Sequence, residues 1–590
     1  MKKFVVLLFI GFLFIVSLPD ITAAAADYIT PEKPFTEKVK QAVGSVKDKT
    51  FLRVPCITWG GEVAAVVANG GVKTARGSAF DKQGLSVEIY RQDDFVKQVE
   101  DYLAGKTPFL RGTLGMINVA AEVCSKDPRT KPIVFLQLTW SNGGDTLVAK
   151  GKIKRPKDLK GKTICLQQYS PHLDYLDAIL KDSGLDWSKV KIKWVKELTL
   201  PPYDTGGKAV DPASAMREDS SIDAVCCIIP DALALTSGGN VGTGAEDSVK
   251  GAKILLSTKT ANRVIADVWA VRKDFFEANR DKVEKFAIGY LQGVEALKDI
   301  QKNKKSKAGP YQQMLSKAAA FLFDSAPATA DVEGLLGDCE FVGFPGNVDF
   351  FTNQGNLNNF ERMNKRIQSF LSREKYVSKS TTLADSQWDY NIMKPHLKDT
   401  ASVKIARFKT EKAEKRLAEK RKKGKLEDDV MFELLINFQP NQNTFDAATY
   451  GKDFEKAIEV AGRYGGALVQ IAGHSDPMGI LKTMKKKIDA NNAGEKERAK
   501  TLELQIQRQK QSVKNLSLTR ANNVRDALIA YAGKQGITID SSQFTVAGYG
   551  IEMPLHKKPK SKEQWLANMR VSFQIIKVEA ELEEFEAIDF

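Results

Sequence analysis

Short apolar runs alternate with amphipathic stretches in the first part of the chain, and this alternation restricts the fold more than any other feature. Leu52 to Ile57 and Ser86 to Tyr90 read as strands, whereas Glu62 to Asn69 and Phe95 to Ala104 read as helices. A further strand is expected over Pro132 to Leu138. Such alternation predicts an α/β unit with a mostly parallel sheet, whose ligands bind at the carboxyl ends of the strands.

A second α/β block is expected after Gly143-Gly144-Asp145. Gly161 to Gln168 predicts a strand, and Ser170 is placed to cap a helix whose first residue would be Pro171. A capped helix start that faces a cleft exposes free backbone N–H groups and a partial positive charge, which suits an anionic ligand. The same pattern also fits an ordinary helix cap with nothing bound.

The order of several segments in this region resembles periplasmic solute-binding proteins of the nitrate, sulfonate and taurine transport type. These segments are residues 153–164, the strand end Gln167 to Ser170, Asp223-Ala224-Val225 with Pro230, and Val264 to Arg272. The resemblance covers about residues 51–377 and implies two lobes, joined by two crossover strands, that close around a small molecule by hinge motion. By position, seven residues are expected around the cleft: Trp59, Gly60, Thr113, Gln168, Ser170, Pro230 and Asp267.

The chemical roles of these residues follow only loosely from the resemblance. Thr113, Ser170 and the backbone around Gly60 could donate hydrogen bonds to oxyanions. Trp59 could cover an apolar tail, or it could be a core aromatic residue. Asp267 would oppose an anion unless it faces away, so the charge of the solute stays open.

Late in the chain, the sequence predicts a carboxylate and a guanidinium that lie close together. Ala467 to Ala472 reads as a short strand, and the turn Gly473 to Gly479 puts Asp476 at the strand end. Ser517 is expected to open a helix, with Arg520 at the edge of its apolar face. Such a pair can hold a zwitterion, the guanidinium binding a carboxylate and the aspartate an ammonium, or it can be a plain salt bridge.

The motifs around this pair, in their order, resemble the OmpA-like peptidoglycan-binding domain. They are Gly473-His474-Ser475-Asp476, Leu516-Ser517 with Arg520-Ala521, Gly548-Tyr549-Gly550 with Pro554, and Asn568 to Val571. The resemblance covers roughly residues 431–578. It implies that Asp476 and Arg520 grip the diaminopimelate of the peptidoglycan stem peptide, with Gly473 and Ser475 beside them.

The chain departs from the family pattern at two points. Three residues before the Leu of Leu-Ser the family usually has an Asn, and this chain has Val513, so that contact is missing or supplied by Asn515. The family also runs almost directly from the Asp loop into the Arg helix, whereas Asp476 and Arg520 are 44 residues apart here. Residues 480–515 carry the pattern of a helical hairpin that leaves the domain and returns.

The first residues have the pattern of an export signal. Met1-Lys2-Lys3 is followed by the charge-free, mostly apolar run Phe4 to Leu18 and by the small residues Ala23 to Ala26. Fifteen residues are short for a membrane span of about 20, so we expect a cleaved signal peptide rather than an anchor. This predicts a protein of the periplasm that is associated with the cell wall or outer membrane.

Charge and cysteine content narrow the function classes. The formal net charge of +15 is concentrated, with 11 Lys or Arg against 3 Glu over residues 404–425 and 10 against 4 acids over residues 480–515. Such runs are usually solvated helix faces, or they attract anionic polymers, and nucleic acid is excluded by the export signal. Six cysteines allow fifteen pairings, and four scattered histidines give no metal site.

The predicted organisation is therefore as follows: signal peptide 1–26, polar lead 27–49, two-lobed solute-binding domain 50–398, basic helical linker 399–429 acting as a spacer, OmpA-like domain 430–578 with the insertion 480–515, and acidic tail 579–590. We expect a non-enzymatic envelope protein without a cofactor. Its partners would be peptidoglycan, a small and possibly anionic solute, and an ABC transporter or another envelope complex. The alternatives are a thiamin-precursor type of enzyme that uses Cys226-Cys227, and a structural adaptor with a vestigial cleft.

Overall fold

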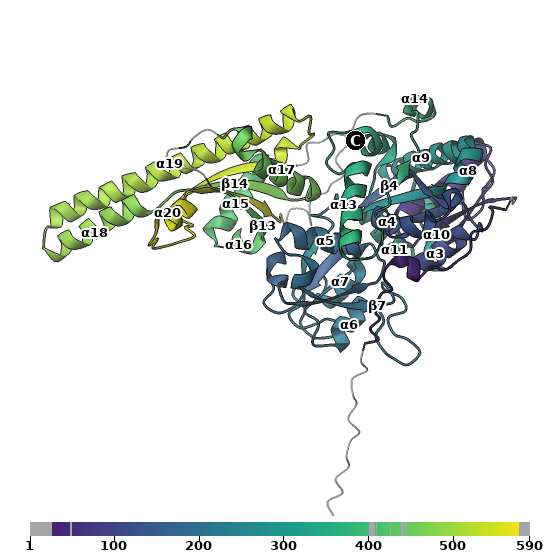
Figure 1. Ribbon diagram of the computed structural model, residues 1–590, viewed down its shortest axis with the longest axis horizontal. Coiled ribbons are helices and arrows are strands. Elements are labelled where there is room, and N and C mark those ends of the chain that lie inside the picture. The colour runs from purple at the N-terminus through teal and green to yellow at the C-terminus, as the bar shows by residue number, and fades with distance from the viewer. Residues whose placement is uncertain are drawn as a thin grey trace, which may run out of the picture.

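The computed structural model describes residues 26–47, 50–400, 408, 410–424, 426–437, 442 and 445–577. The expected signal peptide, apart from Ala26, and the expected acidic tail lie outside the described residues. Two α/β lobes are followed by a third α/β domain, from which a long helical hairpin projects away from the lobes (Figure 1).

The first lobe is built on β1, β2, β3, β4 and β10. Its strands are β1 (Leu52–Cys56), β2 (Val87–Arg91), β3 (Phe109–Thr113), β4 (Pro132–Ser141), β10 (Ala266–Arg272), β11 (Cys339–Phe341) and β12 (Ala384–Asp385). β1 pairs parallel with β2, and β10 runs antiparallel between β3 and β4. The main covering helices are α1 (Gly61–Asn69), α3 (Phe95–Leu103), α4 (Leu114–Cys124), α9 (Arg280–Lys302) and α10 (Ala308–Phe323).

The second lobe has a five-stranded sheet in the order β7-β6-β8-β5-β9. Its strands are β5 (Asp145–Ala149), β6 (Thr163–Gln167), β7 (Lys191–Val195), β8 (Ala224–Ile228) and β9 (Lys253–Ser257). Its helices are α5 (His172–Asp182), α6 (Pro212–Glu218) and α7 (Ile229–Leu235). The chain crosses between the lobes through residues 142–144 and 258–265, which form the hinge.

Both lobe sheets are mixed, so the expectation of mostly parallel sheets is only half right. β6 runs parallel to β7 and β8, but β5 is antiparallel to β8 and β9. β5 and β10 are the strands that enter each lobe through the hinge. Each starts beside the carboxyl ends of neighbouring strands, as Asp145 opposite Ile228 and Asp267 opposite Thr113 show, and must therefore run in the opposite direction.

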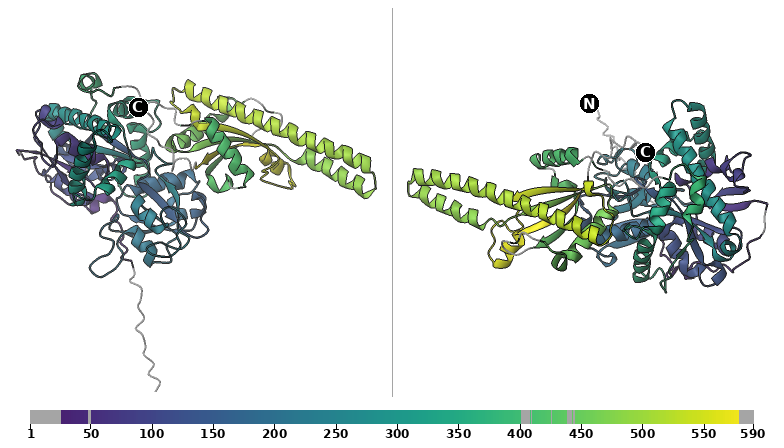
Figure 2. Two further views of the ribbon diagram at one scale, coloured as in Figure 1. Left: turned by 180° about the vertical axis from the view of Figure 1, so that it is seen from behind. Right: turned by 90° about the horizontal axis from the view of Figure 1, so that it is seen from above.

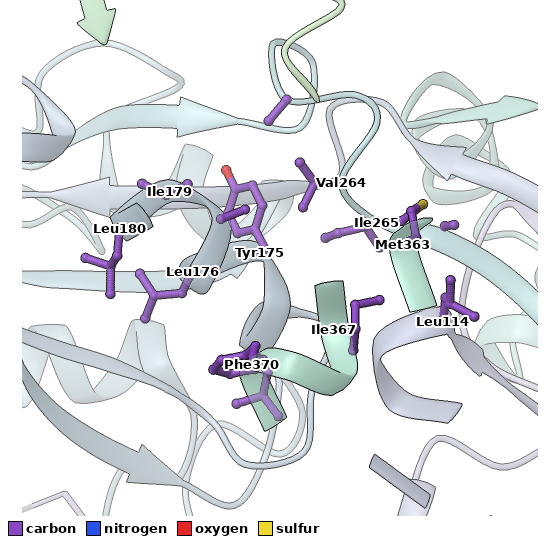
Figure 3. Packing of buried hydrophobic residues seen from close by; sticks show 14 of the residues in the cluster. Leu114, Tyr175, Leu176, Ile179, Leu180, Val264, Ile265, Met363, Ile367 and Phe370 are labelled. Atoms are coloured by element: carbon purple, nitrogen blue, oxygen red, sulfur yellow. The ribbon is translucent and has the colours of Figure 1, made fainter. Parts of the chain in front are cut away.

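Helix α13 (Phe360–Arg373) joins the lobes behind these crossovers. Met363 and Ile367 of α13 lie between Leu114 of α4 and Tyr175 of α5 (Figure 3). All of these side chains are nearly inaccessible, and they belong to one hydrophobic core cluster that runs through both lobes into the third domain. The closing helix expected near residues 357–370 is thus present and seals the two lobes together.

The polar lead crosses both lobes, and we call residues 26–47 the strap. At its start, the Ile29 N–H donates to the Trp194 carbonyl at 2.9 Å in the second lobe. At its end, the Gly44 N–H donates to the Leu103 carbonyl at 2.8 Å in the first lobe. Between these points Phe35 is buried, with 1% of its surface exposed, although its neighbours in the sequence are polar.

The third domain has a four-stranded sheet in the order β13-β16-β14-β15. Its strands are β13 (Val430–Asn437), β14 (Leu468–His474), β15 (Phe544–Gly550) and β16 (Arg570–Ile576). β14 and β15 are parallel, and β16 runs antiparallel between β13 and β14. The carboxyl ends of β13, β14 and β15 therefore meet at one edge of the domain. Its longer helices are α17 (Ala447–Arg463), α18 (Met478–Asn492) and α19 (Lys496–Lys534).

The prediction that Ser517 opens a helix is wrong, because α19 is one continuous helix of 39 residues. No Gly or Pro interrupts residues 496–516, so the returning half of the insertion continues without a break into the helix that carries Arg520. α18 and α19 form the projecting hairpin, which extends beyond the sheet in all three views (Figures 1 and 2). Lys487 and Glu503 link the two helices with an ion pair of 2.5 Å.

The described part of the linker is not a spacer. α15 (Thr410–Lys422) lies on the face of the third-domain sheet opposite α19. Leu417 is 3% exposed there, and the Arg421 guanidinium lies 4.5 Å from the centre of the Tyr549 ring. The third domain also touches the lobes directly, since the Gly466 N–H donates to the Thr260 carbonyl at 3.1 Å in the hinge. The apolar residues Phe408 and Leu417, which are few among the charges of the linker, decide where it packs.

Candidate functional site

The expected wall-binding residues gather at the strand ends of the third domain. Asp476 follows the carboxyl end of β14, in a loop that is fixed to β15 and α19. The Ser475 N–H donates to the Gly550 carbonyl at 2.8 Å, and Ser475 Oγ donates to the Val513 carbonyl at 3.3 Å. The Gly550 N–H in turn donates to Ser517 Oγ at 2.9 Å. These bonds hold the Asp476 loop beside the part of α19 that precedes Arg520.

Gly473 is required because the backbone of α19 lies directly above it. A Cβ atom at this position would come within 1.9 Å of the Ser517 carbonyl oxygen, far inside van der Waals contact. The absence of a side chain therefore lets the helix carrying Arg520 settle on the end of β14.

Arg520 points toward the same edge of the domain. It is 3% exposed, and its Nε donates to the Gln442 carbonyl at 3.3 Å in the connection between β13 and α17. Burial lowers the pKa of Arg520, and burial raises the pKa of Asp476 against the opposing effects of the Met478 N–H and Lys482. A direct Asp–Arg ion pair would shift both pKa values the other way. Burial is therefore the largest cause of the pKa shift of each group.

Asn515 is not brought to this edge. It is exposed on α19, and its Oδ1 accepts a hydrogen bond from Gln511 Nε2 one turn earlier at 2.8 Å. Because 515 and 520 are five residues apart on a helix with 3.6 residues per turn, the two side chains leave α19 in different directions. The substitute contact expected from Asn515 stays a prediction that its position does not favour.

The sequence analysis assigned no role to His474 and Arg570, which lie on the opposite face of the sheet from α19. His474 Nε2 lies 3.1 Å from Ser572 Oγ, and its ring stacks on Tyr549 with centroids 5.3 Å apart. Burial, assisted by Arg570, lowers the pKa of His474 to about 3, so this imidazole is neutral at physiological pH. Strand alternation from Gly473 would have shown that His474 faces away from Arg520.

In the first lobe, Trp59 and Gly60 are built into the hinge region. Trp59 Nε1 donates to Thr139 Oγ1 at 3.0 Å, and the indole ring lies so close to Gly144 that a Cβ there would be 2.4 Å from Cη2. A Cβ on Gly60 would lie 2.3 Å from the Leu335 carbonyl oxygen. Trp59 therefore contacts the crossover itself.

Asp267 belongs to a buried ion network rather than to an open surface. Its Oδ1 accepts from Arg111 Nη1 at 2.9 Å and its Oδ2 from Thr139 Oγ1 at 3.0 Å, while Arg111 Nε donates to Glu62 at 2.6 Å. Burial raises the pKa of Glu62 to about 7 despite Arg111. The neighbouring Thr113 caps α4 by accepting from the Met116 N–H at 3.2 Å. The Asp267 carboxylate is thus bonded to Arg111 and Thr139 inside the lobe, and the charge of the solute stays open.

In the second lobe, Gln168 and Ser170 flank Tyr169 at the carboxyl end of β6. Ser170 Oγ accepts from the His172 N–H at 3.2 Å and so caps the start of α5. Tyr169 has a positive φ of 54°, a conformation that residues with a side chain seldom adopt. Pro230 is exposed in the first turn of α7. Gln168, Tyr169 and Ser170 therefore share one loop at the edge of the lobe.

The helix starts that would attract an anion face carboxylates of the protein itself. A Cβ on Gly115, in the first turn of α4, would lie 2.2 Å from Oδ1 of Asp174 on α5. Burial raises the pKa of Asp174 to about 7. At the start of α5, His172 Nε2 lies 2.9 Å from Oδ1 of Asp145, the first residue of β5. The lobes are therefore closed on each other, with their own acids beside both helix starts.

Two hollows among the described residues are lined by none of the seven expected cleft residues. The larger of the two is a groove of about 510 Å³ between the strap and β7, lined by Tyr28, Ile29, Thr30, Pro31, Lys33, Ile192, Lys193 and Trp194. All six cysteines are buried and free, and burial raises the pKa of the Cys226 thiol. Within the described ranges no group of three or more His, Cys, Asp or Glu side chains could hold a metal ion, and none of the helices there is long and apolar enough to cross a membrane.

Part of the chain matches a known family model. Residues 78–303 match the model described as NMT1/THI5 like, which is less than half of the chain. No curated protein sequence matches the chain.

Solved structures with similar folds include two sulfonate-binding proteins. The periplasmic aliphatic sulphonate binding protein SsuA from Escherichia coli is 13% identical, with 61% of this chain and 96% of that chain covered and a TM-score of 0.39. A putative sulfonate ABC transporter protein, SsuA from Methylobacillus flagellatus KT, is 16% identical, with 62% and 100% covered and a TM-score of 0.40. The desulfurization enzyme DSZB is 13% identical, with 59% and 99% covered and a TM-score of 0.34.

All three TM-scores lie below 0.5, so the fold assignment rests on the family match and on the sheet topology. Together they give the N-terminal region a mixed α/β, periplasmic-binding-protein-like fold with two lobes and a double crossover. The family match ends at residue 303, and the OmpA-like assignment of residues 430–578 stays a prediction.

Proposed function

We propose that this chain is a non-enzymatic envelope protein that binds a small solute between its two lobes and anchors to peptidoglycan through residues 430–578. The solute-binding part is supported by the periplasmic-binding-protein-like fold of the N-terminal region, whose hinge consists of residues 142–144 and 258–265. The sulfonate-binding neighbours suggest a periplasmic location and an ABC transporter as partner.

One observation carries the wall-binding part of the proposal. Asp476 follows the carboxyl end of β14, and Arg520 donates to the Gln442 carbonyl beyond the end of β13, so both lie at the same edge of the third domain; burial raises the pKa of Asp476 and lowers that of Arg520 there. Desolvated charges of opposite sign, held by the Ser475 and Ser517 hydrogen bonds, are suited to a zwitterion. The amino-acid end of diaminopimelate supplies an ammonium for Asp476 and a carboxylate for Arg520.

Calorimetry with a soluble muropeptide that contains diaminopimelate tests this assignment. The full chain is the proper sample, because the third domain packs directly on the lobes. We expect Asp476→Ala and Arg520→Ala each to weaken binding at least tenfold, since each leaves a charged group of the ligand unpaired. Asn522→Ala, which removes a partly exposed side chain of α19 outside the predicted site, is the matched control and should bind like the unchanged chain. Unchanged affinity in both site variants would remove the wall-binding proposal.

The solute-binding part has a test of its own. Native mass spectrometry of protein purified from its host should detect a bound small molecule that is lost on unfolding. A chain that emerges empty, and that binds none of the small molecules of its host envelope, would instead be a structural adaptor with a vestigial cleft.

An enzyme is the second candidate, because the family model and DSZB both connect this fold with enzymes. The candidate residue is Cys226, which points into the core cluster, whereas Cys227 points into the core of the outer part of the second lobe. Both thiols are fully buried with raised pKa values, which disfavours the reactive thiolate. A catalytic turnover that Cys226→Ser abolishes, in a variant that folds normally, would establish the enzyme in place of our proposal.

A further inference from the structure

The strap is attached to both lobes. In the second lobe, Tyr169 Oη donates to the Glu32 carbonyl at 2.7 Å, next to the strand pairing of Ile29 with Trp194. In the first lobe, Arg272 Nη1 donates to the Gly44 carbonyl at 2.9 Å. The strap is thus attached to both moving parts of a hinged pair.

Phe35 is the side chain of the strap that enters the space between the lobes. Its ring meets Tyr169 of the second lobe edge-on, with centroids 4.8 Å apart, and stacks near Phe95 of the first lobe at 6.4 Å. Its N–H donates to the Tyr376 carbonyl at 2.8 Å. Phe35 therefore contacts one aromatic ring from each lobe and has 1% of its surface exposed.

The loop on which Phe35 rests is the one that sequence reasoning assigned to the solute. Gln168 and Ser170 stand on either side of Tyr169, and the positive φ of Tyr169 turns its ring toward the strap. Residues held in sparsely populated backbone conformations are concentrated at ligand clamps, because the surrounding structure must hold them there. The Phe35 side chain covers this loop at Tyr169.

Apart from Phe35, the strap is held mainly by hydrogen bonds: the Asp27 N–H donates to the Ala209 carbonyl at 2.8 Å, Tyr28 Oη to Asp219 at 2.6 Å, and Lys33 Nζ to the Glu374 carbonyl at 3.0 Å. Lys40, Gln41 and Ala42 are exposed, and the first half of the strap leaves the groove of about 510 Å³ open against β7. Val39 is also buried, at 2% exposure, in the same hydrophobic core cluster as Phe35. A segment with few buried side chains opens locally at a lower cost than the core that it covers.

We propose that Phe35 is an internal occupant of the solute site, and that a solute carrying an aromatic ring binds by taking its place between Tyr169 and Phe95 and releasing the strap. The inference rests on the proposed solute-binding function and adds the chemical class of the solute and the element that competes with it. Release of the strap also frees the two lobes from their shared restraint, so binding and hinge opening are coupled.

Indole, as an aromatic probe, and the full chain test this inference in two ways. In the unchanged chain, saturating indole should speed hydrogen exchange at the Ile29 and Phe35 N–H groups, whose bonds to Trp194 and Tyr376 break when the strap leaves. In Phe35→Ala, indole should bind at least tenfold more tightly than in the unchanged chain, because burial of a phenylalanine no longer competes with it.

Two controls separate the proposed site from an ordinary cavity. Val39→Ala, in the same strap, should bind indole like the unchanged chain. Phe80→Ala removes a ring of the same size from the first-lobe core, where Phe80 stacks on Phe286 at 4.9 Å, and should leave strap exchange unaltered when indole is added. The inference would be overturned if Phe80→Ala bound indole as tightly as Phe35→Ala. It would also be overturned if indole did not alter hydrogen exchange of the strap in the unchanged chain.

The exchange measurement in the unchanged chain decides the question if Phe35→Ala does not fold. A natural solute without an aromatic ring, which binds while the strap stays protected, would overturn the inference and leave the solute-binding function in place. If indole releases the strap in a protein that carries no solute in its host, the aromatic site between Tyr169 and Phe95 is supported and the proposed solute-binding function in the host is not.

Discussion

The buried contact between Arg463 and Asp182 fastens the third domain to the second lobe. Arg463 ends α17 and Asp182 ends α5; Arg463 Nε lies 2.9 Å from Asp182 Oδ2 and Nη2 lies 2.5 Å from Oδ1. Their side chains are 8% and 4% exposed. Although burial alone would lower it, Asp182 raises the pKa of Arg463, as expected for a bidentate buried pair.

Arg463→Met removes the charge and keeps most of the side-chain volume. It leaves the Asp182 carboxylate buried without its partner, which typically costs about 3–5 kcal/mol. The double variant Arg463→Met with Asp182→Leu replaces both charges by apolar groups, and such replacements are often close to neutral. We therefore expect the single variant to be destabilised by about 3–5 kcal/mol and the double variant to recover most of that loss.

Hydrogen exchange measures this effect at the domain contact itself. The Arg263 N–H donates to the Arg463 carbonyl and the Gly466 N–H to the Thr260 carbonyl, so both report opening between the hinge and the third domain. Exchange at these two sites should rise in Arg463→Met and fall back in the double variant. Arg525→Met, which breaks an exposed pair with Asp526, is the control and should change the stability by less than about 1 kcal/mol. A loss below 1 kcal/mol in Arg463→Met, or a double variant as unstable as the single one, would refute the reasoning.

Three further predictions concern the wall site, the closed lobes and the linker. Gly473→Ala should lower muropeptide affinity at least tenfold in calorimetry, because its Cβ would lie 1.9 Å from the Ser517 carbonyl and push α19 off β14. Asp174→Asn should flatten the pH dependence of urea unfolding: the pKa of about 7 in the folded chain lies above the usual 3.9, so the contribution of Asp174 to stability is present below pH 4 and lost as the pH rises to 7. The variant should gain on the unchanged chain over that range, by no more than about 4 kcal/mol at 1.36 kcal/mol per pKa unit, and parallel curves would contradict this. Leu417→Ala should destabilise the third domain by about 2–5 kcal/mol in thermal unfolding, whereas Leu435→Ala, at a site 41% exposed, should change it little.

Local patterns in the sequence account for the elements and for much of the wall site. Apolar alternation predicted β1, β2, β4 and β6 of the lobes, and the order of motifs placed Asp476 at the end of β14 and Arg520 on the helix beside it. The missed start of α19 has a simple cause. Serine is a common helix cap, but the Ser517 hydroxyl accepts from the Gly550 N–H of β15 instead. The sequence alone does not distinguish a serine that caps a helix from one that bonds to a neighbouring strand.

Contacts between distant segments were decided by the tertiary structure alone. Phe35 lies in a polar stretch without periodicity, so nothing local signals that it is buried between Tyr169 and Phe95. Arg463 and Asp182 are 281 residues apart, and each alone reads as an ordinary exposed charge near a helix end. Periodicity records which face of an element is apolar, but it does not record which other element will cover that face. The burial of Phe35 beside Tyr169 and Phe95 and the attachment of the third domain to the second lobe therefore follow from packing, which is a property of the whole chain.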